Sequence, residues 1–235
     1  MVSVIIPTLN EARNLRHVFD GRPDLVSEVV VVDGHSIDDT VDVARQPRPD
    51  GKAVMENRRG KGNALACGVM KCTGDIVVLM DADGSTFAKG SCPAPGGASL
   101  DITRFRRLGN KGLGTLVNLL CRTRNTDPCC GFNAFWREHA DALRLTVADS
   151  TDGRLWGDGF EIKTLITVRA ARGYLRIVEV ASIEHPRVHG VSNLNASTDG
   201  LRVLGTILME CRQSRKSVVS RRDDVQLDQR MEGVA

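Results

Sequence analysis

Two aspartates, Asp81 and Asp83, are the residues best suited by type and spacing to bind a ligand or a metal ion. Their carboxylates are separated by one residue and follow the apolar run Ile76–Met80. A continuous apolar run predicts a strand buried on both faces of a parallel sheet, so both carboxylates would lie at its carboxyl end. Ligands of open α/β sheets bind at that edge. Paired carboxylates there suit Mg²⁺ or Mn²⁺ shared with a diphosphate, and we predict such a metal site. An exposed Asp-x-Asp loop without a ligand is the alternative.

Two other polar residues are expected at the same edge. Asp33 ends the apolar run Val29–Val32, where its carboxylate would accept a hydrogen bond from a nucleobase or a ribose hydroxyl, unless it only forms a turn. Lys61 lies between two glycines just before a predicted helix, which is a favourable place for a phosphate. The segment is neither a Walker A loop nor a G-x-G-x-x-G motif, because Leu65 stands at the third glycine position.

The elements that would position these residues alternate between strands and helices along the first third of the chain. Apolar runs bounded by Pro, Gly and Asp predict strands, and apolar residues at helical spacing predict helices. The predicted strands are Val2–Ile6, Val29–Val32, Ala53–Met55 and Ile76–Met80. The first predicted helix is Glu11–Phe19, and the second opens on a capping box of Ser36 and Asp39 and continues through Ala44. The third follows Gly62 through Met70 and has Gly74 as its C-cap.

The rest of the chain is predicted to be more helical. We expect a loop at Ser91–Ala98, helices at Thr103–Arg124, Phe160–Arg172 and Asp199–Arg212, a strand at Arg176–Val180 and a polar loop at Glu184–Asn195. The alternation of strands and helices predicts an α/β fold.

The composition is that of an ordinary folded protein. Of 235 residues, 41% are hydrophobic and 26% are charged, and the net charge is +3, which excludes disordered and fibrous classes and predicts no nucleic-acid partner. The seven cysteines form no C-x-x-C pair, so neither a zinc knuckle nor a disulfide framework is expected. We see no leader peptide and no apolar run of about 20 residues, and we expect a cytoplasmic location.

One segment suggests contact with a membrane surface. Four basic residues precede the apolar stretch Leu113–Leu120 within a single predicted helix. A basic, amphipathic helix can lie in the interface of a bilayer. Packing of the same helix into the core is the alternative. The basic residues are Arg104, Arg106, Arg107 and Lys111.

Five segments, taken in order, carry a family resemblance. Together they resemble a family 2 glycosyltransferase with the GT-A fold, on the branch of the dolichyl- and polyprenyl-phosphate sugar synthases, over roughly residues 2–210. The resemblance implies an α/β, Rossmann-like fold with a mixed, mostly parallel sheet flanked by helices. The segments are Pro7–Glu11 (PTLNE), Val31–Thr40 (VVDGHSIDDT), Gly60–Ala64 (GKGNA), Gly74–Asp75 and Met80–Gly84 (MDADG).

The resemblance also implies how the chain is divided. We expect one glycosyltransferase domain over residues 1–212. Beyond it the apolar periodicity of the sequence is lost, which predicts a flexible tail over 213–235. Within the domain, residues 1–86 would bind the nucleotide-sugar and residues 87–212 would form the acceptor side.

Residues are assigned to the substrates by the same resemblance. Thr126–Phe135 resembles the acceptor-side loop of the family, Gly159–Ile162 the start of the helix that follows it, and His185–Leu194 a basic loop that closes over the phosphates. The metal would be held by Asp81 and Asp83. The nucleotide-sugar would be bound by Pro7, Thr8, Leu9, Glu11, Asp33, Lys61, Asp81, Ala82, Arg187 and His189.

The reaction implied is displacement at the anomeric carbon with inversion. Mg²⁺ or Mn²⁺ and basic side chains would stabilise the departing nucleoside diphosphate. A hydroxyl acceptor needs a general base, for which Asp127 is the first candidate and Glu161 the second, whereas a lipid phosphate is already nucleophilic. As alternatives, Asp127 would only start a turn before Pro128, and Glu161 would be a solvated helix residue.

The sequence departs from the family pattern in several places. Gly84–Thr86 runs straight into Phe87–Ser91, so that a helix of the acceptor side is missing. Gly34 stands where a second Asp is common, and Leu9 where an aromatic residue often stacks on the base. The acceptor therefore stays open between a polyprenyl phosphate, a glycan and a small molecule, with a UDP- or GDP-type donor. A catalytically inactive binding protein and a sugar-1-phosphate nucleotidyltransferase are the alternatives.

Overall fold

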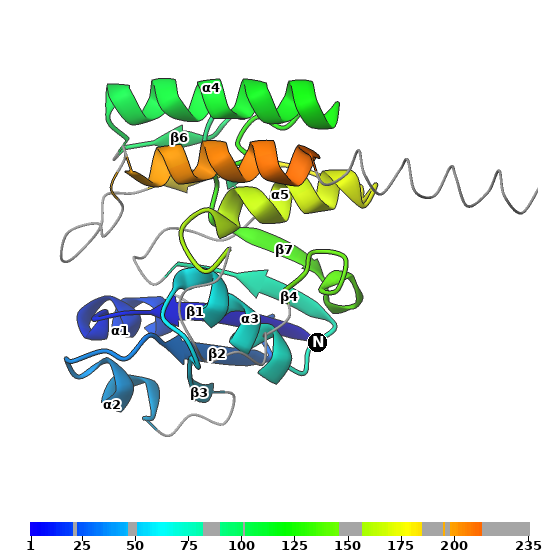
Figure 1. Cartoon of the computed structure of the whole chain (residues 1–235). Helices are drawn as coiled ribbons and strands as arrows, with labels where there is room; N and C mark the ends of the chain where they lie inside the picture. Colours follow the sequence, from blue (N-terminus) through cyan, green and yellow to red (C-terminus); the bar gives the residue numbers. More distant parts are fainter. Residues whose placement is uncertain are drawn as a thin grey trace, which may run out of the picture.

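A five-stranded sheet lies at the centre of the computed structural model, which describes residues 1–20, 23–46, 51–81, 90–100, 102–145, 157–184, 195 and 198–212 (Figure 1). Its strand order is β3-β2-β1-β4-β7, with β1 to β4 parallel and β7 antiparallel to β4. This arrangement confirms the predicted mixed, mostly parallel sheet. The strands are β1 (Val2–Thr8), β2 (Glu28–Asp33), β3 (Gly51–Met55), β4 (Ile76–Leu79) and β7 (Asn133–Trp136).

Helices cover both faces of this sheet (Figure 1). The first half of the chain supplies α1 (Ala12–Asp20), α2 (Thr40–Ala44) and α3 (Lys61–Lys71), and the second half supplies α4 (Arg104–Cys121), the short 3-10 helix η1 (Arg137–His139), α5 (Ile162–Arg172) and a helix over 198–212. Two small parallel pairs join the second half, β5 (Gly90–Ser91) with β8 (Val180–Ala181) and β6 (Ala98–Ser99) with β9 (Ile183–Glu184).

Alternating side chains of the central strands build a core on each face. Ile5 and Val30 belong to the cluster under α3 and α5, whereas Val4 and Val31 belong to the cluster under α1 and α2. Because side chains alternate along a strand, this register keeps both faces apolar and holds the four parallel strands side by side. Their carboxyl ends are thereby brought to one edge of the sheet.

An outer layer of helices lies on α5. α4 and the 198–212 helix pack against it around Val117, Val168, Val203 and Ile207 (Figure 1). Glu210, which is buried, accepts hydrogen bonds from Arg169 and Arg172 of α5 at 3.0 Å each. Two charged partners compensate the burial of one carboxylate, so this cluster ties the last described helix to the domain.

Three local predictions were wrong. Ser36 and Asp39 form no capping box, because the Ser36 hydroxyl donates to Asp33 Oδ1 at 2.6 Å and Asp39 makes no side-chain cap bond to α2. Gly74 does not cap α3, whose C-cap residue is Cys72. A β-carbon at Gly74 would lie 2.5 Å from Ser3 Oγ, so the close approach to β1 requires glycine. Residues 176–179 form no strand, and β8 begins only at Val180.

Other predictions lie outside the described residues. They are the flexible tail at 213–235, the missing helix after Thr86 and the polar loop between Glu184 and Asn195. None of the described helices is long and apolar enough to cross a membrane.

Candidate functional site

Asp81 lies two residues after the end of β4 and is held between two lysines. Lys61, the first residue of α3, binds Asp81 Oδ1, and Lys163 of α5 donates to Oδ2 at 2.9 Å. The Lys61 ammonium also lies 5.7 Å from the centre of the Phe160 ring, which favours a cation over the ring face. The structure therefore gathers two cations and one carboxylate at the edge where ligands of such sheets bind.

The electrostatic balance at Asp81 favours its charged form. Burial alone would raise the pKa of this carboxyl, but the charges of Lys163 and Lys61 and their hydrogen bonds to it outweigh burial and hold the pKa well below its ordinary value. The carboxylate is thus ionised throughout the physiological range, and it compensates the charges of both lysines. A diphosphate bound at this edge would meet the same two ammonium groups.

The loops after β1 and β2 are tied to each other beside this group. Asn10 N–H donates to Ser36 Oγ at 2.8 Å, and Ser36 in turn donates to both oxygens of Asp33 through its N–H at 2.9 Å and its hydroxyl at 2.6 Å. Ile37 N–H closes the ring by donating to Asn10 Oδ1 at 2.9 Å. Asn10 has a φ of 58°, which an asparagine tolerates better than most residues. The network fixes Asp33 at the end of β2.

The other predicted nucleotide contacts differ in their exposure. Thr8 and Asp33 are buried at the ends of adjacent strands, and Glu11 is buried at the start of α1. Leu9 is 45% exposed and so remains accessible to a ligand. Pro7 is half-buried within β1. The structure thus brings Pro7, Thr8, Leu9, Glu11, Asp33, Lys61 and Asp81 to the carboxyl edge of the sheet.

The two glycines that flank Lys61 lie against the backbone of residues 157 and 158. A β-carbon at Gly62 would lie 1.7 Å from the carbonyl oxygen of Gly157, and one at Gly60 would lie 2.2 Å from that of Asp158. Gly62 N–H donates to the Asp158 carbonyl at 3.0 Å. The glycines therefore allow the backbone of residues 157 and 158 to pack closely against the start of α3. The Gly62 N–H is used in a hydrogen bond within the protein.

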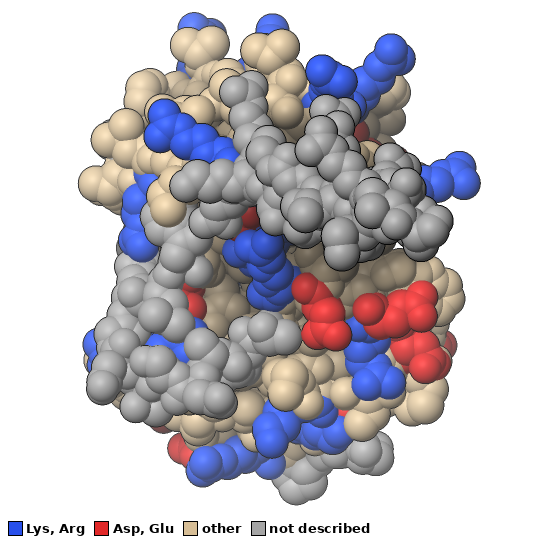
Figure 2. Space-filling model, turned by 45° about the vertical axis from the view of Figure 1, so that its right-hand side comes forward, with Lys and Arg blue, Asp and Glu red and all other residues tan. Residues whose placement is uncertain are grey.

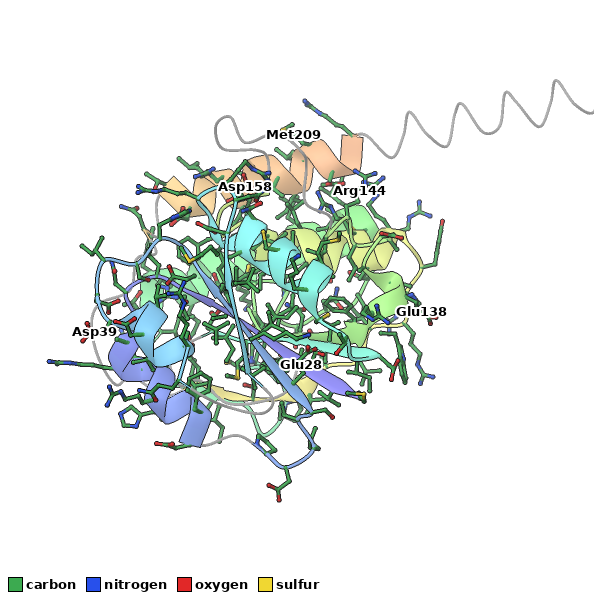
Figure 3. All side chains as sticks on the ribbon, turned by 90° about the horizontal axis from the view of Figure 1, so that it is seen from below. Glu28, Asp39, Glu138, Arg144, Asp158 and Met209 are labelled. Atoms are coloured by element: carbon green, nitrogen blue, oxygen red, sulfur yellow. The ribbon has the colours of Figure 1, made fainter. Side chains whose placement is uncertain are left out.

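A buried ion pair reinforces this contact. Arg58 Nε and Nη2 donate to the two oxygens of Asp158 at 3.2 Å and 3.1 Å, and both side chains are almost fully buried. In Figure 3 Asp158 lies beside the segment that leads into α3. The pair joins the turn before α3 to the segment before α5, and so fixes the position of Lys163 relative to Lys61.

Asp127 lies in the loop between α4 and β7, on the acceptor side of the predicted division. Its carboxyl accepts hydrogen bonds from the backbone N–H groups of Cys129 and Cys92. Burial raises its pKa, the nearby Glu179 and Glu184 raise it further, and the two N–H donors oppose the shift. The same loop contains Gly131, where a β-carbon would lie 3.0 Å from Asp81 Oδ2. The loop thus connects Asp127 with the charged group.

Glu161 is not a solvated helix residue, because its side chain is only 1% exposed. One oxygen accepts the Gly159 N–H at 3.2 Å and lies 3.5 Å from an Arg202 guanidinium nitrogen. Its other oxygen is buried without a hydrogen-bond partner among the described residues. Glu161 is therefore buried at the N-cap position of α5, next to Phe160 in the chain.

Several predicted residues lie outside the described part of the chain. They are Ala82, Asp83, Arg187 and His189. Among the described residues, no group of three or more His, Cys, Asp or Glu side chains could hold a metal ion. Asp81 is thus the described member of the predicted metal pair.

Sequence reasoning missed three residues of the site. They are Arg58, Asp158 and Lys163, which act through contacts between distant segments. The spacing Glu161-x-Lys163 on a helix already assigned to the site was the available signal for Lys163. No signal within one segment pairs Arg58 with Asp158.

Sequence comparison identifies relatives across most of the chain. The family described as "Glycosyl transferase family 2" matches residues 3–89. An uncharacterized glycosyltransferase of Mycobacterium tuberculosis is 34% identical over 212 residues, which cover 85% of this chain and 92% of the relative. The dolichol-phosphate mannosyltransferase of Pyrococcus furiosus is 30% identical over 223 residues, with 84% of this chain and 60% of the relative covered.

A solved structure shares the fold. Glucosyl-3-phosphoglycerate synthase from Mycobacterium tuberculosis, in complex with Mn²⁺, UDP-glucose and phosphoglyceric acid, superimposes with a TM-score of 0.64 at 25% identity. The match covers 90% of this chain and 79% of the synthase. The GT-A fold expected from the sequence is thereby confirmed.

The contact at Gly62 can be tested with two alanine substitutions. Gly62→Ala should lower the free energy of unfolding by about 1–3 kcal/mol or more, because the new β-carbon would overlap a backbone oxygen that cannot swing away. Gly112→Ala is the matched control, because a β-carbon on that exposed α4 residue would meet no atom within 4 Å. The control should leave stability unchanged or raise it by about 0.5–1 kcal/mol. Urea unfolding measures both, and equal effects would contradict the close approach.

Proposed function

Because the chain belongs to glycosyltransferase family 2, we propose that it transfers a sugar, with inversion, from a UDP- or GDP-type donor to a polyprenyl phosphate, a glycan or a small-molecule hydroxyl. The observation that carries this proposal is Asp81, ionised and bound by Lys61 and Lys163 at the carboxyl edge of the sheet. This group of charges can exchange internal ion pairs for contacts with a diphosphate.

The donor would lie across the ends of β1, β2 and β4. Its nucleoside would contact Thr8, Leu9 and Asp33, and the network through Asn10 and Ser36 would hold that part of the site in place. Its diphosphate would lie toward Lys61 and Lys163, whose charges offset the negative charge that grows on the leaving group. The division of residues 1–86 and 87–212 into donor and acceptor halves is part of this proposal.

The residues partly fit a divalent cation. Asp81 offers hard oxygen ligands at a strand end, and Asp83, which lies outside the described residues, would be the second ligand. Both oxygens of Asp81 are bound by ammonium groups, so a lysine must turn toward phosphate before the carboxylate can hold the ion. Mg²⁺ or Mn²⁺ at this place would supply further positive charge against the diphosphate. The related synthase structure, which holds Mn²⁺ with UDP-glucose, supports this assignment.

Asp127 is the better of the two candidate bases for a hydroxyl acceptor. Its raised pKa brings the carboxyl closer to the range in which a base both accepts a proton and remains largely ionised. Glu161 is buried against Gly159 and Arg202, so we propose that it positions the start of α5. The mannosyltransferase relative is named for a dolichol phosphate acceptor, which favours a lipid phosphate and would make the base dispensable.

A lipid acceptor would require contact with a membrane surface, and α4 fits that role. Phe105, Leu108 and Leu119 are 68%, 72% and 74% exposed along this helix, and residues 104–121 include no Asp or Glu. In Figure 2, Lys and Arg side chains lie among uncharged surface at the top of the molecule, the end that α4 forms in Figure 1. We propose that this face rests on an anionic bilayer.

Nucleotide binding tests the donor site. With Mn²⁺ present, one of UDP or GDP at about 100 times its Kd should raise the melting temperature by about 5 °C or more, since a ligand of the native state stabilises it by mass action. Asp81→Asn should abolish the part of the shift that needs Mn²⁺. Asp24→Asn, an exposed carboxylate remote from the site, is the control and should behave as wild type. No shift with either nucleotide, from a folded protein, would favour an inactive relative.

Vesicle binding tests the membrane face. The protein should sediment with phosphatidylcholine vesicles that contain phosphatidylglycerol and far less with phosphatidylcholine alone. Leu108→Ser should weaken binding about tenfold, because an exposed leucine gains about 1.5 kcal/mol or more when buried. Leu25→Ser, which alters a leucine of similar exposure away from α4, should not weaken it. If the wild type does not bind vesicles and Leu108→Ser changes the oligomeric state of the protein, this face of α4 is instead an interface between two copies of the chain.

A further inference from the structure

Glu56 is a buried carboxyl at the donor edge with no role so far. It follows β3 directly and is only 4% exposed. Its backbone N–H donates to the Asp33 carbonyl at 3.1 Å, and its Oε1 accepts the Gly60 N–H at 3.2 Å. No donor to its other oxygen is found among the described residues, so that oxygen can form a hydrogen bond with a ligand or with water.

The position of the carboxyl is that of the proposed nucleoside site. A β-carbon at Gly34 would lie 3.3 Å from Glu56 Oε1 and 3.2 Å from the Thr8 carbonyl oxygen. The carboxyl thus lies against the ends of β1 and β2, beside Asp33. Because Gly34 has no side chain, the Glu56 carboxyl can pack against its backbone.

The surroundings of Glu56 disfavour its ionised form. Burial, together with the smaller effect of the Asp158 and Asp33 carboxylates, raises its pKa to about 7. The Gly60 N–H and the Arg59 charge oppose it. Arg58 also faces the group, but its guanidinium is bound to both oxygens of Asp158. Near neutral pH a large share of the protein therefore carries Glu56 as a neutral acid with a hydroxyl to donate.

We infer that Glu56 is a specificity-determining residue of the donor site, which in its neutral form donates a hydrogen bond to an acceptor oxygen on the nucleobase or ribose. The inference rests on the proposed function and adds a residue to it. Ionisation removes this donor and places a third carboxylate charge beside Asp33 and Asp158. Donor affinity should therefore be full below the folded pKa and fall as the pH rises through it.

Calorimetric titration of the wild type with UDP and GDP, between about pH 6 and pH 9, tests the inference. The affinity for the preferred nucleotide should fall up to about tenfold per pH unit above about pH 7, and binding there should take up one proton, seen as a dependence on the buffer's ionisation enthalpy. Glu56→Gln keeps a hydrogen-bond donor without a titrating proton, so its affinity should not fall with pH. Glu56→Ala should bind weakly throughout.

The outcomes separate this inference from the proposed function. Equal pH profiles for the wild type and Glu56→Gln, with no proton uptake, would overturn the role of Glu56 while leaving nucleotide binding established. Failure of the wild type to bind any nucleotide at any pH would overturn the proposed function and this inference with it. Should Glu56→Ala fail to fold, as judged by circular dichroism, the wild-type proton uptake and the isosteric Glu56→Gln still decide the matter.

Discussion

The contact between the turn before α3 and the segment before α5 is the constraint on which the rest of the site depends. It needs glycine at positions 60 and 62, because any side chain there would overlap the backbone of residues 157 and 158. The Arg58–Asp158 pair closes the same contact through side chains. Loss of one partner from a buried pair of this kind costs about 3–5 kcal/mol, because the other charge is then left buried and uncompensated.

This contact determines the charge distribution at the sheet edge. It sets the amino-terminal ends of α3 and α5 side by side, so that Lys61 and Lys163 reach Asp81 from two directions. The three groups carry one net positive charge between them, which is held in place before any anion arrives. Such a preformed arrangement lowers the reorganisation that binding a diphosphate requires. Under the proposed function, Asp81 would bind a divalent cation only once phosphate oxygens compete for the two lysines.

The sequence sufficed for the parts of the site that depend on neighbouring residues. Asp33 and Asp81 were placed correctly because apolar runs end just before them, and the order of parallel strands then puts both at one edge. Lys163 and Asp158 were not found, because their partners lie 82 and 100 residues away. Gly74 was misread as a helix cap for a similar reason, since its close neighbour is Ser3 on another strand.

The central claim is that the Asp81 carboxylate becomes available to a divalent cation when a nucleoside diphosphate draws the lysines away. Titration with Mn²⁺, followed by the electron paramagnetic resonance signal of the free aqueous ion, tests it most directly. With UDP or GDP present at a fixed concentration, the wild type should bind one Mn²⁺ per chain at least about tenfold more tightly than without nucleotide. In Asp81→Asn with the same nucleotide, this gain in Mn²⁺ affinity should be lost, so that Mn²⁺ binds no more tightly than it binds to the nucleotide without protein. Equally tight binding of Mn²⁺ by the wild type in the absence of nucleotide, or an undiminished gain in Asp81→Asn, would contradict the claim.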